Sequence, residues 1–150
     1  MKRTVLLLAI GFTTFTAYAQ KMKEATLPAS VKESFSKQYP GIKGAKWEKE
    51  NENYEAEFIN NKVETSVLYN AFGSLLETEI ELKTSELPKE VSEYVTKNMA
   101  GKNVKEASKI TNAKGDVTYK AQIEGSNYIF DRWGKFQNKG GEKNTNKSKD

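Results

Sequence analysis

The chain has 150 residues, with 24 Lys and Arg against 20 Asp and Glu, and it contains neither His nor Cys. The absence of both residues excludes Ser-His and Cys-His nucleophiles, the usual zinc sites and disulfide bonds. A folded domain of this chain must therefore be stabilised by its hydrophobic core.

The formal net charge of +4 comes from the two ends of the chain. Residues 1–19 and the last sixteen residues hold seven cations and two anions. Residues 20–134 therefore carry 17 Lys and Arg against 18 Asp and Glu. A nucleic-acid-binding domain would instead gather cations and aromatic rings on its folded surface. We therefore expect no nucleic-acid partner.

Residues 1–19 are typical of a signal peptide. A positive start, Met1-Lys2-Arg3, precedes an apolar run from Val5 to Phe15 that is too short to span a bilayer, and Ala17-Tyr18-Ala19 offers a small-x-small cleavage site. The alternative, a buried helix or a retained anchor, is disfavoured because polar residues follow at once and no stop-transfer pattern is present. We expect a periplasmic or secreted chain that begins at Gln20, with no membrane insertion after cleavage.

The first predicted helix begins at Pro28 and ends before Pro40-Gly41. Proline suits the first turn of a helix, and Val31 and Phe35 lie at helical spacing. The arrangement recurs in a second predicted helix, with Pro88, Val91, Val95 and Gly101. Each helix has one apolar face, so each should cover one side of a sheet.

After each helix, apolar and polar residues alternate with the period of a strand. The alternating stretches are residues 54–58, 63–69 and 76–82 after the first helix, and 117–123 and 128–130 after the second. Asn60-Asn61 and Gly125-Ser126 separate stretches as tight hairpin turns would. In the third stretch we expect Leu76, Thr78, Ile80 and Leu82 to face inward. Such alternation predicts antiparallel strands with one face exposed to water.

Residues 27–82 recur, more loosely, as residues 87–137. Tyr54–Phe58 is echoed by Tyr119–Ile123, and Tyr69–Gly73 by Phe130–Gly134. The sequence predicts an α+β fold, a tandem duplication of a helix followed by an antiparallel β-meander, in one domain over residues 20–137. The two units should pair edge to edge in one sheet, or pack as two lobes. Residues 138–150 are predicted to be a disordered Lys/Asn-rich tail, and the alternative is a hook for an acidic partner.

Several of these motifs resemble the PepSY-like family of exported bacterial proteins, also described as β-lactamase-inhibitor-like. They are Leu27-Pro-x-x-Val31-x-x-x-Phe35, Tyr39-Pro40-Gly41, Trp47-Glu48, Tyr54–Phe58 and Asn70-x-x-Gly73-x-Leu75-Leu76-Glu77-x-Glu79. The second copy departs, with Met99-Ala100 in place of Tyr-Pro and Ala107 in place of Trp47. The resemblance implies an exported α+β domain of two helix-plus-sheet units, with no catalytic residues to carry over and with inhibition of an enzyme suggested by name alone.

The predicted wet face of the first unit is rich in glutamate. The side chains that should share it are Glu48, Glu50, Glu55, Glu57, Glu77, Glu79 and Glu81. Like charges opposite one another on a sheet are unfavourable unless something offsets them. Cross-strand pairs with Lys46, Lys49 and Lys62 would do so, as would a basic partner or a cation such as Ca²⁺, although no compact calcium-binding loop is visible.

Most aromatic side chains lie at inward positions, where core packing is the expected role. Phe72 and Trp133 are exceptions, because each lies within an Asx-x-x-Gly turn, where side chains usually face water. An exposed aromatic residue on a turn can anchor an interface, although it can also fold back over a helix.

These patterns favour a non-catalytic binding module that uses its open sheet face and hairpin tips to engage, and in one interpretation to inhibit, another envelope or secreted protein. We expect no enzyme, and Gly-x-Ser-x-Gly and P-loop patterns are missing from the sequence. We expect no cofactor and no resident metal. The candidate partner-binding residues are Glu55, Glu57, Glu77, Glu79, Phe72 and Trp133. The alternative is binding of a small ligand or Ca²⁺ on the acidic sheet face.

Overall fold

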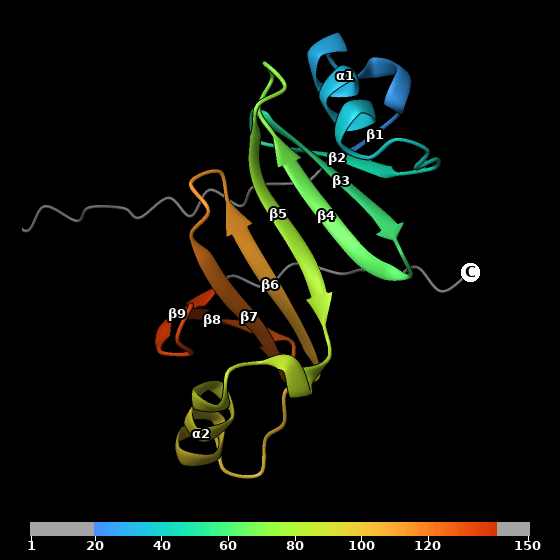
Figure 1. Ribbon diagram of the computed structural model, residues 1–150. Coiled ribbons are helices and arrows are strands. Elements are labelled where there is room, and N and C mark those ends of the chain that lie inside the picture. Colours follow the sequence, from blue (N-terminus) through green and yellow to red (C-terminus); the bar gives the residue numbers. More distant parts are fainter. Residues whose placement is uncertain (1–19, 141–150) are drawn as a thin grey trace, which may run out of the picture.

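The computed structural model describes residues 20–140, which form one antiparallel sheet and two α-helices (Figure 1). The elements in chain order are β1 (Gln20–Met22), η1 (Glu24–Thr26), α1 (Ala29–Gln38), β2 (Lys46–Glu50), β3 (Asn53–Asn60), β4 (Val63–Tyr69), β5 (Leu75–Leu82), η2 (Thr84–Glu86), α2 (Lys89–Asn98), β6 (Glu106–Asn112), β7 (Val117–Ile123), β8 (Ser126–Asp131) and β9 (Phe136–Gly140). The predicted signal peptide lies outside the described residues. The α+β class with an antiparallel sheet is confirmed.

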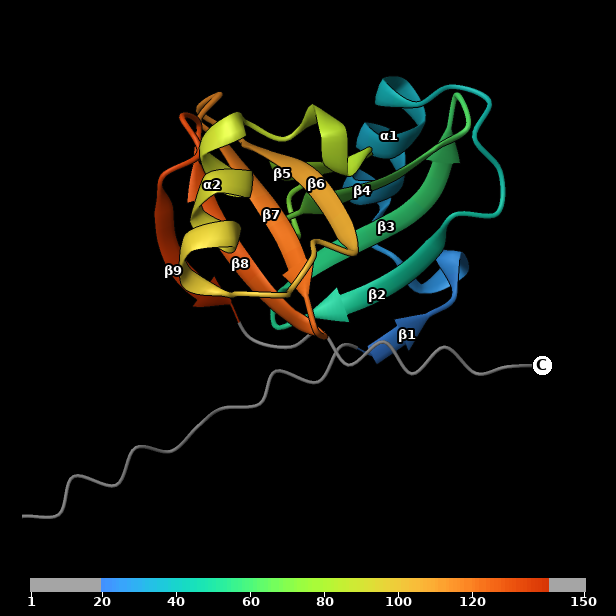
Figure 2. The same ribbon diagram turned by 90° about the horizontal axis from the view of Figure 1, so that it is seen from below.

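The nine strands pair strictly in sequence order, from β1 at one edge to β9 at the other. Of the two arrangements open to the sequence, the single sheet is therefore the one observed, with β5 and β6 joined along the middle. The sheet twists along its length (Figure 2), and β1 and β9 form its two edges. Helices α1 and α2 lie toward opposite ends of the sheet (Figure 1).

Each helix covers its own hydrophobic core. Val31 and Phe35 of α1, one helical turn apart, are buried against the first cluster. Its buried members are Leu27, Val31, Phe35, Trp47, Ala56, Phe58, Val67 and Tyr69. The second cluster lies under α2 and consists of Leu87, Val91, Ala107, Ala121 and Phe130. Both cores lie on the same face of the sheet. The alternate side chains of each strand point to the other face, which neither α1 nor α2 covers.

The first unit contains a strand that the sequence did not indicate. In β1, Met22 lies opposite Trp47 of β2, just as Leu82 at the end of β5 lies opposite Ala107 of β6. A short strand thus precedes each 3₁₀ turn and helix. The strand β1 was missed because three residues are too few to show alternation.

An irregularity at the start of β5 changes which leucine faces the core. Leu68 lies opposite Glu77, whereas its neighbour Tyr69 lies opposite Leu75, so Leu76 is the extra residue of a β-bulge. The expectation that Leu76 packs inward was wrong, because Leu75 is the residue in contact with the first core.

Two hairpin turns also lie one residue away from their expected positions. Asn60 pairs with Val63, so the turn consists of Asn61 and Lys62, both with positive φ. Ile123 pairs with Ser126, which places Glu124-Gly125 in the second turn. Two-residue turns of this kind match the twist of the flanking strands.

The folded region extends beyond the predicted boundary at residue 137. Strand β9 runs to Gly140, which lies opposite Asn127 of β8, so residues 138–140 belong to the sheet rather than to a tail. Residues 141–150 lie outside the described part of the chain.

Candidate functional site

The open face of the sheet contains an acidic trough that crosses the junction between the two units. The trough has a volume of about 310 Å³. Its lining residues are Glu57, Glu64, Ser66, Glu79, Glu81, Glu106, Ala107, Ser108, Lys120, Gln122 and Asn127. Five carboxylates therefore face one ammonium group, which gives the trough a net negative charge.

Strand register explains why these side chains meet. Glu57, Ser66 and Glu79 lie directly opposite one another on β3, β4 and β5. The pairing of β5 with β6 then places Ser108 opposite Glu81, and β7 adds Lys120 opposite Ser108. Because directly opposite residues share a face of the sheet, the trough draws its walls from both units.

A small polar network lies at the junction of the two units. The Ser108 hydroxyl donates a 2.8 Å hydrogen bond to Oε1 of Glu79, and Lys120 forms an ion pair with the same carboxylate. The side chains of Lys120 and Glu79 are only 20% and 19% exposed. Partial burial strengthens such charge-assisted bonds, so this network fixes the floor of the trough.

The structure divides the four predicted glutamates into two rows. Glu57 and Glu79 line the trough. Glu55 and Glu77 lie in the adjacent row, where Leu68 separates them. Glu55 is buried, lies opposite Glu48, and accepts a 3.0 Å hydrogen bond from the Ser66 hydroxyl.

Glu64 and Glu106 line the trough although sequence reasoning did not select them. Alternation along residues 63–69 places Glu64 on the face opposite Thr65 and could have revealed it. Glu106 could not be found in this way, because its position depends on how the second unit pairs with the first.

The predicted lysine partners do not neutralise the acidic face. Lys46, Lys49 and Lys62 form no salt bridge with any residue in the described range 20–140. Lys49 lies opposite Tyr54, on the helix-covered side, with its Nζ 6.0 Å from the ring centroid. The neutralising cation in the trough is instead Lys120, which comes from the second unit.

Phe72 and Trp133 are both exposed, by 87% and 70%, as their turns predicted. In the turn between β4 and β5, Oδ1 of Asn70 accepts hydrogen bonds of 3.0 Å from the backbone N–H groups of Phe72 and Ser74. Asp131 holds the turn between β8 and β9 in the same way. The two aromatic side chains are thus presented on fixed loops.

Both turns pack closely against the beginning of a helix. The Ser30 hydroxyl of α1 donates a 2.8 Å hydrogen bond to the carbonyl oxygen of Ala71. A Cβ atom added to Gly73 would lie 2.5 Å from the Ser30 carbonyl oxygen, and one added to Gly134 would lie 2.9 Å from Cβ of Pro88. Neither Phe72 nor Trp133 lines the trough, so the structure does not join the two parts of the predicted surface.

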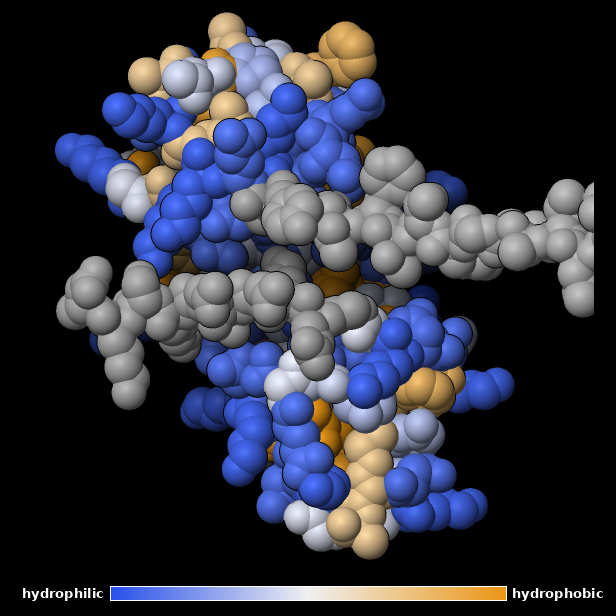
Figure 3. All heavy atoms as spheres, turned by 180° about the vertical axis from the view of Figure 1, so that it is seen from behind, coloured by the Kyte–Doolittle hydropathy of each residue, from blue (hydrophilic) through white to orange (hydrophobic). Residues whose placement is uncertain are grey.

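Figure 3 shows that hydrophilic side chains cover much of the described surface on the side that faces away from the viewer in Figure 1.

Among residues 20–140, no group of three or more Asp and Glu side chains is arranged so that it could hold a metal ion. None of the helices within this range is long and apolar enough to cross a membrane.

Solved structures from Bacteroides species share this fold. A protein of Bacteroides eggerthii, provisionally described as periplasmic, has a TM-score of 0.68 and 18% identity over 76% of this chain and 88% of its own. A DUF2874 family protein of Bacteroides ovatus has a TM-score of 0.66 and 21% identity, over 77% and 87% of the two chains.

A BLIP-like protein of Bacteroides fragilis has a TM-score of 0.59 and 20% identity, over 74% of this chain and 83% of its own. No protein-family model matches the chain, and no curated protein does. At these levels of identity the comparisons establish a BLIP-like fold.

Proposed function

We propose that this protein is a non-catalytic binding module that uses the open face of its sheet to hold another protein. The observation that carries the proposal is the acidic trough, which both units build together around the Glu79, Ser108 and Lys120 network. The lining side chains stand on paired strands, which fix the backbone beneath them. Its excess of carboxylates suits a partner with a basic surface.

The exposed aromatic residues offer a second contact. Phe72 and Trp133 are held by turns whose backbone is already fixed, so little conformational freedom would be lost on binding. Large exposed aromatic side chains are common anchors of protein interfaces. We propose that these two tips contact the partner outside the trough.

The proposed location is the periplasm or the exterior of the cell. The signal-peptide pattern of residues 1–19 supports it, as does the provisional periplasmic description of a protein that shares the fold. We further propose that the two units arose by tandem duplication and that the chain is related to PepSY-like proteins. A partner enzyme inhibited by this protein would agree with the BLIP-like fold.

A pull-down with an envelope extract tests the trough. The variant Glu64→Gln/Glu81→Gln removes two carboxylates that line it. The control Glu33→Gln/Glu93→Gln removes two exposed carboxylates from the helices instead. We expect the trough variant to lose the protein that the wild type captures while the helix variant keeps it. Equal capture by both variants would refute the proposed surface.

A second pair of variants tests the aromatic tips. Phe72→Ser and Trp133→Ser should weaken capture of the same partner, whereas Ile59→Ser, which alters another exposed apolar residue, should not. Retention of full binding in the double variant Phe72→Ser/Trp133→Ser would remove the tips from the interface and leave the trough to be judged separately.

A further inference from the structure

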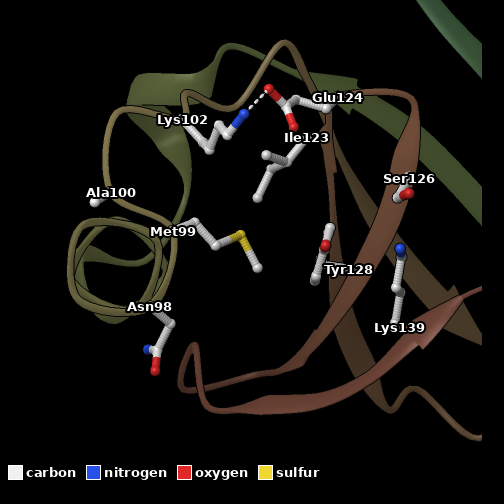
Figure 4. A pocket seen from close by; sticks show the side chains of 9 residues that line it. All are labelled: Asn98, Met99, Ala100, Lys102, Ile123, Glu124, Ser126, Tyr128 and Lys139. Atoms are coloured by element: carbon white, nitrogen blue, oxygen red, sulfur yellow. Dashed lines mark hydrogen bonds and ion pairs between the residues drawn. The ribbon is translucent and has the colours of Figure 1, made fainter.

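A hollow of about 380 Å³ lies at the end of α2, on the helix-covered side of the sheet and away from the acidic trough. Its walls come from the loop after α2, the turn between β7 and β8, and strand β9 (Figure 4). The lining residues are Asn98, Met99, Ala100, Lys102, Ile123, Glu124, Ser126, Tyr128 and Lys139. In Figure 4 the Met99 side chain points across the hollow toward Tyr128.

The first unit fills the equivalent space with aromatic rings. Tyr39 follows α1 as Met99 follows α2, and its ring centroid lies 4.7 Å from that of Phe58 and 5.6 Å from that of Phe35. Burial raises the pKa of Tyr39, and a hydrogen bond with Thr78 acts in the opposite direction. The Tyr39 side chain therefore spans from the helix end to strand β5.

The second unit has smaller residues at the same places. Val95, Met99, Ala107 and Ile123 stand where the first unit has Phe35, Tyr39, Trp47 and Phe58. Lys139 stands where the first unit has Thr78, since Lys139 pairs with Tyr128 as Thr78 pairs with Val67. The hollow thus arises because the second unit lacks the aromatic side chains that fill this space in the first unit. Lys139 adds a positive charge to its wall.

The hollow combines an apolar floor with a cationic wall. Ile123 is 3% exposed and, with Met99 and Tyr128, supplies the apolar part of the lining. The Nζ of Lys139 lies 5.7 Å from the Tyr128 ring centroid and makes no salt bridge with a residue of the described range. A cation held over an aromatic ring without a carboxylate is suited to receive an anion.

Ser126 supplies a second polar group on that wall. It is only 8% exposed, and its hydroxyl makes no hydrogen bond to any described residue. Because alternate residues of a strand share a face, Ser126 and Tyr128 both face the hollow, next to Lys139. At the other rim Lys102 is already paired with Glu124. Lys139 and Ser126 therefore lie together on the wall formed by β8 and β9 and are free of carboxylate partners in the described part of the chain.

We propose that this hollow binds a small monocarboxylate with an apolar tail. The carboxylate would accept hydrogen bonds from Lys139 and Ser126, while the tail would replace the ring that Tyr39 contributes in the first unit and contact Met99, Ile123 and Tyr128. The volume falls within the range of small-ligand sites. The carboxylate lies on the wall remote from the last carbonyl groups of α2, whose partial negative charge would repel it.

Calorimetric titration with octanoate tests the proposal, with octylammonium and octanol as probes of charge. We expect octanoate to bind more tightly than either. The Met99→Tyr variant restores the filling residue of the first unit and should weaken octanoate binding at least about tenfold. Lys139→Thr introduces the residue that the first unit has at the equivalent position, Thr78. This variant should lose the preference for octanoate over octylammonium.

Thermal unfolding of each variant, followed by circular dichroism, keeps loss of binding distinct from loss of the fold. Met99→Tyr should unfold at the same temperature as the wild type or higher, because it fills a void.

A hydrophobic tetrapeptide with a free C-terminal carboxylate, compared with its amide, distinguishes a peptide end from a free acid as the source of the ligand. No heat of binding with either carboxylate, or equal octanoate binding by Met99→Tyr, would overturn the proposal.

Discussion

The Lys120 ammonium on β7 is ion-paired with the Glu79 carboxylate on β5, across the intervening strand β6. Strand β6 contributes Ser108, whose hydroxyl donates to the same carboxylate oxygen. Three strands from the two units are thereby joined by side chains as well as by their backbone ladders. Glu79 is the common acceptor, so it is the residue on which the junction depends.

Replacing Glu79 with Ala should destabilise the protein by about 1–3 kcal/mol, because a partly buried ammonium and a buried hydroxyl both lose their acceptor. Glu79→Gln should cost less, since the amide oxygen still accepts from Ser108. Urea denaturation gives both free energies of unfolding. Equal losses in the two variants would show that the ion pair, and not the hydrogen bond, dominates.

Gly73→Ala and Gly134→Ala should be more destabilising than Gly44→Ala and Gly115→Ala. All four glycines have φ between +73° and +84°, so each substitution carries the backbone strain of about 1–2 kcal/mol. At Gly73 and Gly134 a Cβ would also collide with the adjacent helix, whereas nothing lies within 4 Å at the two controls. Overpacking adds about 1–3 kcal/mol, which urea denaturation can measure. Similar losses at all four positions would contradict the close packing of turn on helix.

Stability should decline at alkaline pH because of Tyr39 and Tyr69. Burial raises the pKa of both phenols above the ordinary value, which is near 10. The unfolded chain therefore releases these protons first, so their contribution is complete below about pH 10 and is lost as the pH rises toward the folded pKa. Urea midpoints between neutral and alkaline pH should fall less steeply in Tyr39→Phe and Tyr69→Phe than in wild type.

Tyr69→Phe also loses the 2.8 Å hydrogen bond that the Tyr69 hydroxyl donates to Oε1 of Gln38. Its free energy of unfolding at neutral pH should therefore be lower by the contribution of one hydrogen bond, about 0.5–1.5 kcal/mol. Parallel alkaline profiles for all variants would exclude both phenols as the cause.

Millimolar Ca²⁺ should leave the thermal unfolding midpoint unchanged. A cation that binds only the folded state must raise that midpoint. We expect no rise, because Lys120 and Ser108 already engage Glu79 and the described residues hold no grouped metal ligands. A calcium-dependent increase that disappears in Glu64→Gln/Glu81→Gln would instead favour the cation-binding alternative.

Local features of the fold were predictable because they depend on residue spacing. The positions of Val31 and Phe35 on α1, and the alternation along β3 and β4, follow from helical and strand periods. The bulge next to Tyr69 was not predictable, and it exchanged Leu76 for Leu75 in the core. A bulge shifts the register without leaving a compositional signal.

The trough was predictable only in part, since half of it depends on tertiary pairing. Alternation placed Glu57 and Glu79 on one face, but the contribution of Glu106 and Lys120 follows from the contact between β5 and β6. The exposure of Phe72 and Trp133 agrees with the turn pattern. Their role in binding stays a prediction.

The strictly sequential order of the nine strands has a consequence for how the chain acquires its structure. Each strand pairs only with its neighbours along the sequence, so no hydrogen-bonded ladder requires a segment from the far end of the chain. The entropic cost of closing loops between such nearby segments is small, which favours fast folding. A chain that emerges from its N-terminus onward can therefore complete the core under α1 before α2 has appeared.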